Sequence, residues 1–296
     1  MLDKSLIQPF EDETTISHEL YCSFLRLDLL HPVVSGNKLF KLKYYLEEAQ
    51  SNHQKGIVTL GGPHSNHLVA SAYAAKESKL ESIGLVRGEQ PVILSETLRD
   101  CQAYGMELTF TSREIFDATT TNMLQERYPA HLVIQQGGYG KTGMRGAMEI
   151  LKIKGTEEFD YILAACGSGT TGAGLIRAAH PNQRVVLLSV LKNNFSILDE
   201  INALVESTEK NYPDFDMLFD FHLGGYAKKN TALFKTMISF QSKHQIPTDF
   251  VYTGKLVHGF YQLANASFFQ KKSKILLIHS GGLQGNRSLT KNELIY

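Results

Sequence analysis

The sequence of 296 residues lacks a net charge, because 30 basic residues balance 30 acidic ones. A protein that binds nucleic acid normally has a basic stripe, so this balance argues against a nucleic-acid partner and favours a small molecule. Cysteines are few: Cys22, Cys101 and Cys166 are scattered and have no C-x-x-C spacing. Such cysteines form neither a disulfide framework nor a zinc site. We therefore expect no metal and a reducing, cytoplasmic location.

Long apolar runs are lacking as well. The N-terminal segment includes Asp3 and Lys4, and no run approaches the roughly 18 apolar residues of a membrane-spanning helix. Internal repeats and low-complexity segments are also absent from the sequence. The sequence therefore predicts a soluble globular protein without a membrane partner.

Short apolar runs alternate with helix-like stretches along most of the chain. The runs are rich in Val, Ile and Leu and mostly lack polar alternation, as buried parallel strands do. Strands are expected at 56–60, 82–86, 107–110, 131–135, 161–165, 185–190 and 274–279. Helices are expected at 39–50, 66–78, 143–153, 172–179, 196–209, 230–244 and 257–269. This alternation predicts an α/β fold with a mostly parallel sheet.

Four of the expected strands end in glycine-rich turns. The turns lie at 61–62, 137–138, 167–169 and 281–282. Ligands of open α/β sheets bind beyond the carboxyl ends of the strands. The four turns therefore predict a single active site, although composition marks no domain boundary.

The segment 166–174, Cys-Gly-Ser-Gly-Thr-Thr-Gly-Ala-Gly, joins an expected strand to an expected helix. Its small residues let the backbone wrap around an anion, and its helix-start amides and the Ser168, Thr170 and Thr171 hydroxyls supply donors. It is not a Walker A loop, because no lysine follows at the required place. Its glycines have G-x-G-x-x-G spacing, but no acidic ribose partner stands about twenty residues on. Alone, the segment predicts either a phosphate cradle or an ordinary tight turn.

Ser-Gly-Asn-Lys at 35–38 places Lys38 directly before an expected helix. A lysine buried among apolar and cationic neighbours loses proton affinity and can become a Schiff-base nucleophile. Repulsion from Lys41 and Lys43 would lower the pKa of Lys38 further. On these residues alone, the preferred interpretation is a solvated basic face at a helix start.

Gly-Gly-Pro-His-Ser-Asn-His at 61–67 leads into the expected helix 66–78. Ser65 or Asn66 is expected to be its N-cap. A helix start also presents amides to a carboxylate, so Ser65 would lie beside a bound substrate.

Six motifs occur in order: S-G-N-K at 35–38, G-G-x-x-S-N-H at 61–67, G-G-Y-G at 137–140, C-G-S-G-T-T at 166–171, V-Y-T-G-K at 251–255 and H-S-G-G at 279–282. Together they resemble, over residues 26–285, the family of D-cysteine desulfhydrase and 1-aminocyclopropane-1-carboxylate deaminase. The resemblance implies pyridoxal 5'-phosphate as cofactor and its fold type II, which is tryptophan synthase β-like, with helices on both faces of open twisted sheets. It also implies a homodimer, with a large cofactor-binding domain of residues 1–40 and 146–296 and a small domain of residues 41–145.

The same resemblance implies roles for individual residues. Lys38 would hold the cofactor as a Schiff base, Tyr252 would flank a small amino-acid substrate, and Ser65 would meet its carboxylate or take part in proton transfer. The implied catalytic residues are Lys38, Ser65 and Tyr252. The implied cofactor-binding residues are Lys38, Asn66, Gly167, Ser168, Gly169, Thr170, Thr171 and Ser280. The implied substrate-binding residues are Ser65, Asn66, His67, Tyr252 and Thr253.

Two positions separate the branches of this family. Deaminases have Glu after the tyrosine of V-Y-x-G-K and Leu before the last Gly-Gly, whereas this sequence has Thr253 and Ser280. A neutral hydroxyl near the ring nitrogen suits β-elimination with a good leaving group. The sequence therefore predicts a lyase that converts D-cysteine to pyruvate, hydrogen sulfide and ammonia. The alternatives are a 1-aminocyclopropane-1-carboxylate deaminase that forms 2-oxobutyrate and ammonia, a nucleotide-binding α/β protein, and a catalytically silent homologue. His64 precedes Ser65-Asn66, at a position where Gln is more usual in this family. The identity of the substrate therefore stays open.

Overall fold

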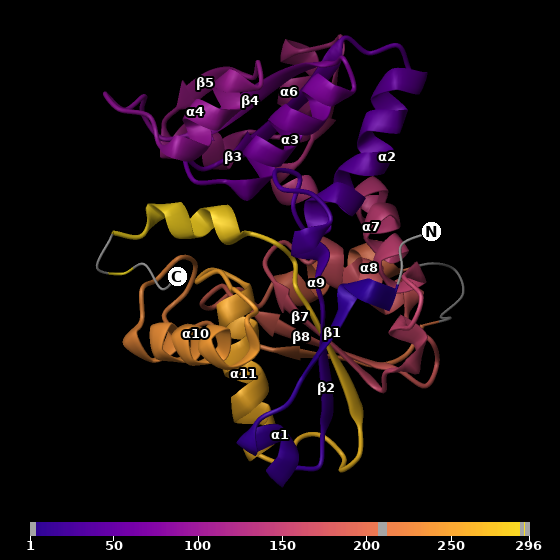
Figure 1. Ribbon diagram of the computed structural model, residues 1–296. Coiled ribbons are helices and arrows are strands. Elements are labelled where there is room, and N and C mark those ends of the chain that lie inside the picture. Colours follow the sequence, from indigo (N-terminus) through magenta and orange to yellow (C-terminus); the bar gives the residue numbers. More distant parts are fainter. Residues whose placement is uncertain (1–3, 207–211, 291–292, 294–296) are drawn as a thin grey trace.

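The computed structural model describes residues 4–206, 212–290 and 293 of the chain, and their strands form two sheets (Figure 1). The larger sheet has six strands in the order β1-β2-β10-β7-β8-β9. Its strands are β1 (Ile7–Phe10), β2 (Tyr21–Leu25), β7 (Tyr161–Cys166), β8 (Arg184–Ser189), β9 (Phe215–Leu218) and β10 (Lys274–Ile278). Only β1 is antiparallel to its neighbour among these described strands.

The smaller sheet has four parallel strands in the order β5-β4-β3-β6. Its strands are β3 (Gly56–Gly61), β4 (Glu81–Arg87), β5 (Glu107–Thr111) and β6 (His131–Ile134). Every residue of β3 is buried. A strand buried on both faces needs no polar alternation, which is the pattern that the sequence has here.

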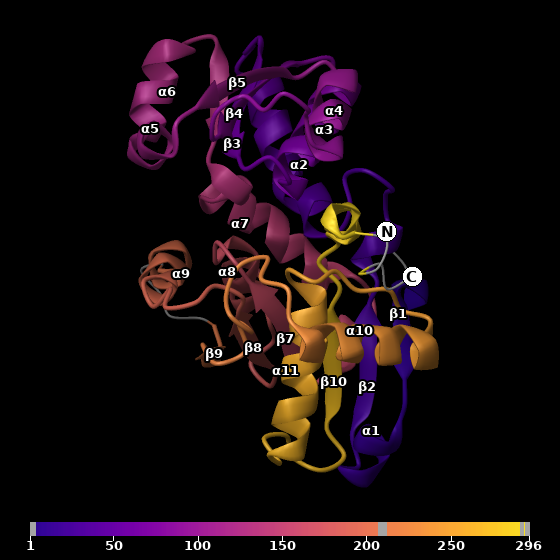
Figure 2. The same ribbon diagram turned by 90° about the vertical axis from the view of Figure 1, so that its left-hand side faces the viewer.

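Helices cover both faces of both sheets (Figures 1 and 2). The larger sheet lies between α7 (Lys141–Met148), α8 (Thr170–Ala178) and α9 (Ile197–Val205) on one face and α1 (Glu13–Ser17), α10 (Thr231–His244) and α11 (Thr253–Asn265) on the other. The smaller sheet lies between α2 (Asn37–Ser51), α3 (Asn66–Glu77) and α4 (Glu96–Ala103) on one face and α5 (Arg113–Ala118) and α6 (Thr121–Arg127) on the other. Helices α2 and α7 pack together where the two sheets meet.

Strand β7 shows how the pleat divides the core. Ile162, Ala164 and Cys166 belong to the apolar cluster beneath α8 and α9. Tyr161 and Leu163 belong to the cluster beneath α10 and α11. Because successive side chains point to opposite faces, each strand of this kind supplies two separate cores.

All seven expected strands are present, with small shifts at their ends, so the α/β prediction is confirmed. Three further strands, β1, β2 and β9, were not expected. Strand β1 contains Pro9, whose lack of an N–H suits the edge of a sheet, and it pairs through tertiary contacts that no local pattern reveals.

The seven expected helices are also present, but several bounds differ. The expected helix 143–153 is α7 followed by a 3-10 turn at Glu149–Lys152. The expected helix 257–269 begins earlier, at Thr253, and ends at Asn265. Helix α9 ends at Val205, and residues 207–209 of the expected helix lie outside the described residues. Helices α1, α4, α5 and α6 were not expected. Over the described ranges, no helix has the length and apolar character needed to cross a membrane.

Candidate active site

A cavity of about 640 Å³ lies where the carboxyl ends of the two sets of parallel strands meet. Its wall includes the first turns of α2 and α3, residues 165–169 and 171–172 at the end of β7 and beyond it, and the turn at 280–282 after β10. Of the four glycine-rich turns, those at 137, 167–169 and 281–282 line it directly, and the turn at 61–62 leads into the lining residues 65–67. The glycine-rich turns therefore meet at one cavity beyond the strand ends, as the sequence predicted.

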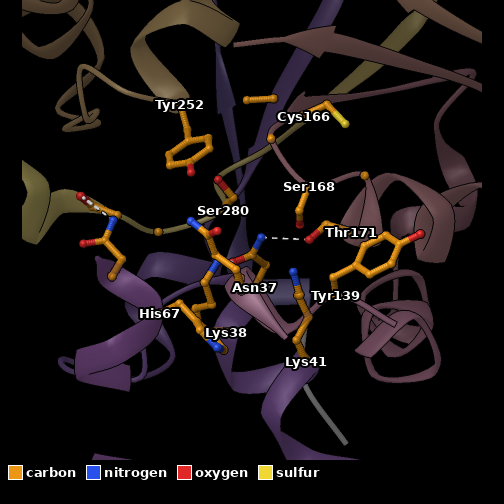
Figure 3. A pocket seen from close by; sticks show the side chains of 18 of the residues that line it. Asn37, Lys38, Lys41, His67, Tyr139, Cys166, Ser168, Thr171, Tyr252 and Ser280 are labelled. Atoms are coloured by element: carbon orange, nitrogen blue, oxygen red, sulfur yellow. Dashed lines mark hydrogen bonds between the residues drawn. The ribbon is translucent and has the colours of Figure 1, made fainter. Parts of the chain in front are cut away.

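Two lysines of α2 line this cavity, Lys38 and Lys41 (Figure 3). Lys38 is partly buried, and its Nζ donates to Asn37 Oδ1 at 3.1 Å. Burial lowers the pKa of Lys38 to about 8, and the Asp249 carboxylate opposes that shift. An amine with such a pKa exists partly as the free base near neutral pH, which is the form that attacks a carbonyl carbon.

The causes of this shift match the expectation in part. Burial lowers the pKa of Lys38, the repulsion between Lys38 and Lys41 is mutual, and Lys43 is not among the causes. Lys43 is exposed and lies over the Tyr44 ring, 4.9 Å from its centroid. Lys41 is buried, and burial together with repulsion from Lys38 holds its pKa well below the usual range. The solvated basic face is therefore limited to Lys43.

The start of α2 is held against two other parts of the wall. Gly36 has a φ of +67°, and a Cβ there would lie 2.0 Å from the carbonyl oxygen of Ser280, so only glycine fits. The Asn37 backbone N–H donates to the same oxygen at 3.2 Å. The Asn37 side chain donates to Thr171 Oγ1 at 2.8 Å, the bond drawn in Figure 3. These contacts fix Lys38 between the turn after β10 and the turn after β7.

The turn after β7 has the form of an anion cradle. Gly169 precedes α8 with a φ of 75°, and as the N-cap it has no side chain to cap the first amides of this helix. A Cβ on Gly167 would lie 3.1 Å from the Tyr252 ring, and one on Gly169 would lie 2.8 Å from Ile201. Free amides at a helix start attract an anion. Lys41 points toward this turn in Figure 3, and an anion bound there would favour the protonated form of its amine.

The hydroxyls of this turn differ in position. Ser168 and Thr171 line the cavity. Thr170 is fully buried and lies behind the lining residues, with its Oγ1 3.4 Å from Ser168 Oγ. The sequence did not distinguish these three side chains.

The first turn of α3 contributes three residues. Of the two N-cap candidates, Ser65 and Asn66, Ser65 is the N-cap, because its Oγ accepts from the Leu68 N–H at 3.3 Å. Asn66 donates from Nδ2 to the Gly282 carbonyl oxygen at 3.4 Å, and its buried Oδ1 has no partner among the described residues. His64, in contrast, is exposed and lies outside the lining.

His67 is buried beside both lysines. Thr59 Oγ1 donates to the Ile134 carbonyl oxygen at 2.7 Å, so it accepts from His67 Nε2 at 2.8 Å. This arrangement leaves Nδ1 of His67 as a bare acceptor, buried and without a partner in the described part of the chain. Burial and the positive charges of Lys38 and Lys41 keep the pKa of His67 well below its usual range, so the ring is neutral.

Tyr252 lines the wall of the cavity across from Lys41, beside Ser280 (Figure 3). Its ring meets that of Tyr226 edge-on, with the ring centroids 6.2 Å apart, and burial raises the pKa of Tyr252 well above its usual range. Thr253, expected near the substrate, is fully buried and absent from the lining. The Asp249 carboxylate accepts from the backbone N–H groups of residues 251–253 and from Thr253 Oγ1.

The turn after β10 brings Ser280 to the wall. His279 precedes it, is fully buried, and lies with Nε2 2.7 Å from the Pro247 carbonyl oxygen. His279 Nδ1 lies 3.3 Å from Asp28, which in turn pairs with Arg26 at 2.7 Å. These buried contacts fix the direction from which Ser280 enters the cavity.

The family of the chain follows from comparison with known proteins. A model of the family described as "Pyridoxal-phosphate dependent enzyme" matches residues 8–281. The chain belongs to this family. The expected enzyme class, the fold type II architecture and the cofactor pyridoxal phosphate are thereby confirmed, and the nucleotide-binding alternative is replaced.

Individual relatives agree with this membership. A putative 1-aminocyclopropane-1-carboxylate deaminase of Thermotoga maritima is 30% identical over 280 residues, which are 88% of this chain and 88% of the relative. A bifunctional D-cysteine desulfhydrase/1-aminocyclopropane-1-carboxylate deaminase of Arabidopsis thaliana is 27% identical, over 85% of this chain and 70% of the relative. A crystal structure titled as an ACC deaminase homologue superposes with a TM-score of 0.76 at 26% identity, covering 95% of this chain and 90% of that one. The resemblance inferred from the motifs is confirmed.

The residues present fit the family's cofactor. The cavity combines a partly buried amine of low pKa, a helix start with uncapped amides in the described structure, and the unpartnered Oδ1 of Asn66. An aldehyde, a phosphate and a polar ring substituent are the groups that would satisfy these three features.

Among the residues that sequence reasoning missed are Lys41 and Tyr226 of the cavity lining and Asp249 behind it. Lys41 was weighed only as a neighbour of Lys38, although it stands one helical turn further along the same face. Tyr226 follows the pair Gly224-Gly225, a signal like that of the four turns, which could have revealed it. Asp249 was missed because the expected helix began too late to show that an acidic residue stands at its start.

Proposed function

We propose that the protein is a lyase that removes the β-substituent of a small amino acid, with D-cysteine as substrate. Together with water, D-cysteine would yield pyruvate, hydrogen sulfide and ammonia. The observation that supports this choice is the Ser280 hydroxyl on the cavity wall, at the position where the motifs place a neighbour of the cofactor ring nitrogen. A hydroxyl leaves that nitrogen less protonated than a carboxylate would. Expulsion of a thiol is easy enough to proceed under those conditions.

Cofactor binding is assigned to four groups of this chain. Lys38 would attach the cofactor, and the backbone of residues 167–171 would hold its phosphate with the hydroxyls of Ser168 and Thr171, while Thr170 supports Ser168 from behind the lining. Lys41 supplies a positive charge on the same side of the cavity. Asn66 and Ser280 contact the ring. When bound, pyridoxal phosphate supplies an electron sink for the negative charge that develops at the substrate Cα.

Proton handling is assigned to Lys38. Its pKa of about 8 allows it both to accept and to return a proton near neutral pH. Tyr252, with its raised pKa, keeps its proton and acts as a hydrogen-bond donor to the substrate. The Ser65 hydroxyl accepts from Leu68, so its own proton remains available for a substrate carboxylate at the start of α3. His67 presents Nδ1 to the same region as an acceptor.

Thr253 lies near the substrate site and acts on the substrate through its neighbours rather than by direct contact. Its hydroxyl and backbone bind Asp249, and Tyr252 stands next to it in the chain. Thr253 therefore acts by fixing the direction of Tyr252.

A second candidate is deamination of 1-aminocyclopropane-1-carboxylate, which with water would yield 2-oxobutyrate and ammonia. It is supported by the name of the Thermotoga relative and by the name of the bifunctional Arabidopsis relative. Ring opening has no good leaving group, so it needs a more fully protonated ring than Ser280 would give.

The two candidates are separated by a substrate panel with detection of the keto acid. The purified protein, loaded with pyridoxal phosphate, is incubated with D-cysteine, L-cysteine or 1-aminocyclopropane-1-carboxylate. Pyruvate from D-cysteine, with little 2-oxobutyrate from the cyclic amino acid, is the expected result. The reverse pattern would overturn the choice of reaction, and no keto acid from any of them would support a catalytically silent homologue.

The division of the chain, its assembly and its location are part of the same proposal. Residues 1–40 and 146–296 form the large cofactor-binding domain, and residues 41–145 form the small domain. The support is that all strands of the larger sheet fall in the first set and all described strands of the smaller sheet in the second. A cytoplasmic homodimer is proposed, and light scattering of the purified protein tests the dimer.

A further inference from the structure

Lys255 is a buried lysine that the proposed reaction does not use. It belongs to the V-Y-T-G-K motif, lies in the first turn of α11 and is 1% exposed. Its Nζ donates to the carbonyl oxygens of Gly225 at 2.6 Å and of Val190 at 3.3 Å. Burying an amine is unfavourable unless it is hydrogen-bonded, and its pKa falls to about 8. These two bonds therefore account for its presence in the core.

Both acceptors stand immediately before residues of the cavity wall. Leu191 follows Val190, and Tyr226 follows Gly225; both line the cavity. The two segments come from different places in the chain, one after β8 and one between β9 and α10. Lys255 thus joins two separate parts of the wall to the helix whose start holds Tyr252.

The segment around Gly225 has an unfavourable backbone. Leu223, Gly224, Gly225 and Ala227 all have positive φ values, of 49°, 94°, 115° and 51°. Left-handed conformations of residues with a Cβ are costly and persist only where surrounding contacts hold them. The Gly225 carbonyl oxygen, which Lys255 binds, lies in the middle of this run.

We propose that Lys255 is a positioning residue that holds the wall segment 223–227 in place, so that the Tyr226 ring packs edge-on against that of Tyr252. Lys255 itself does not reach the cavity lining. Without its bonds, the left-handed run relaxes and Tyr226 moves away from Tyr252. The kinetic part of this inference rests on the proposed function, whereas the conformational part does not.

Limited trypsin digestion tests the conformational part without any substrate. Lys228 and Lys229 are exposed and directly follow the segment, so cleavage after them reports its opening. Lys255→Met, which keeps the apolar stem but removes the donors, should accelerate this cleavage about ten- to a hundredfold, the effect of losing a charged hydrogen bond. Lys235→Met removes an exposed lysine of the neighbouring helix α10 and serves as the control. Cleavage after the distant exposed Lys271 should be unchanged in both variants.

A tryptophan reporter gives a second measurement. The chain has no tryptophan, so Tyr226→Trp introduces a single fluorophore in the segment. Position 226 is half-exposed, so adding Lys255→Met should shift the emission maximum of this fluorophore and change its quenching by acrylamide. If Lys255→Met does not fold, Lys255→Gln, which keeps one donor, takes its place in both experiments. A folded variant with cleavage and quenching like those of its parent would overturn the proposal.

A double-mutant cycle separates positioning from general stability. If Lys255 acts through Tyr226, then Lys255→Met should lower kcat/KM for D-cysteine in the parent but have little further effect beside Tyr226→Ala. Fully additive losses would contradict the coupling. If the parent turns over no substrate, the cycle fails together with the proposed function, while the digestion and quenching results still decide the role of Lys255.

Discussion

Thr253 Oγ1 donates a 2.7 Å hydrogen bond to Asp249 Oδ1, and both side chains are fully buried. The same Thr253 oxygen accepts from the Asp249 N–H at 2.7 Å. Position 253 therefore faces Asp249 and lies behind the cavity wall. Deaminases of this family have Glu at this position. In this protein the Asp249 carboxylate already occupies the space beside position 253, so a Glu side chain would have to point elsewhere.

Thr253→Glu should therefore destabilise the fold before it changes the reaction. The new carboxylate would lie in a dry space beside Asp249, and an unpaired buried charge costs about 3–5 kcal/mol. Urea unfolding of the apoprotein measures this loss. Thr253→Ser keeps both hydrogen bonds and should stay within about 1 kcal/mol of the parent. A Thr253→Glu protein with parental stability would mean that the side chain turns toward the cavity instead.

Lys38→Ala should abolish covalent attachment of pyridoxal phosphate, whereas Lys41→Ala should keep it. Only the Lys38 amine lies at the junction of the two turns with a pKa of about 8. Borohydride reduction followed by peptide mass spectrometry identifies the modified lysine. Lys41→Ala should instead weaken cofactor binding about ten- to a hundredfold, because a charged hydrogen bond is worth about 1.5–3 kcal/mol. Modification of Lys41 in the unchanged protein would reverse the two assignments.

The hydroxyls of the turn after β7 should contribute unequally to cofactor affinity. Thr171 lines the cavity and accepts from Asn37 at 2.8 Å, so Thr171→Val should weaken pyridoxal phosphate binding about tenfold or more. Thr170 is fully buried, so Thr170→Val, its matched control, should have a smaller effect. Equilibrium dialysis at several cofactor concentrations measures both. Equal losses would show that Thr170 also reaches the phosphate.

The sequence predicted the parts of this molecule that depend on local patterns. Buried strands such as β3 and β7 are continuous apolar runs, and glycine-rich turns follow them, so strand ends and site could be located together. The N-cap of α3 is a local signal as well, and the sequence narrowed it to Ser65 or Asn66.

Residues whose roles depend on distant contacts could not be found in this way. Strand β1 is stabilised by β2 and has a proline, and Asp249 gains its role from a helix start whose position was misjudged. Lys41 and Lys43 look alike in the sequence, yet one is buried and the other exposed. Burial of a particular lysine depends on tertiary packing, in this case of α2 against α7.

Lys38 also predicts how the stability of the apoprotein depends on pH. Its pKa is about 8 in the folded protein against an ordinary value of 10.5. Between these two values the unfolded chain binds more protons than the folded one, so this residue makes stability rise with pH across that window. Below pH 8 the charged Lys38 amine in the cavity wall lowers the free energy of unfolding. Above pH 10.5 the amine is neutral in both states, and this destabilisation is gone.

Lys38→Met should therefore be more stable than the parent at pH 7, and the difference should shrink as the pH rises from about 8 toward 10.5. Urea unfolding of the cofactor-free proteins at several pH values measures it. Lys38→Met also removes the repulsion that Lys38 exerts on Lys41, and this relief stabilises the variant in the same direction. Lys43→Met, which removes an exposed lysine of the same helix, should show no such trend. If Lys38→Met were less stable than the parent at pH 7, the Lys38 amine would have to be well solvated in the folded protein, and its assignment as the free-base nucleophile would lose its physical basis.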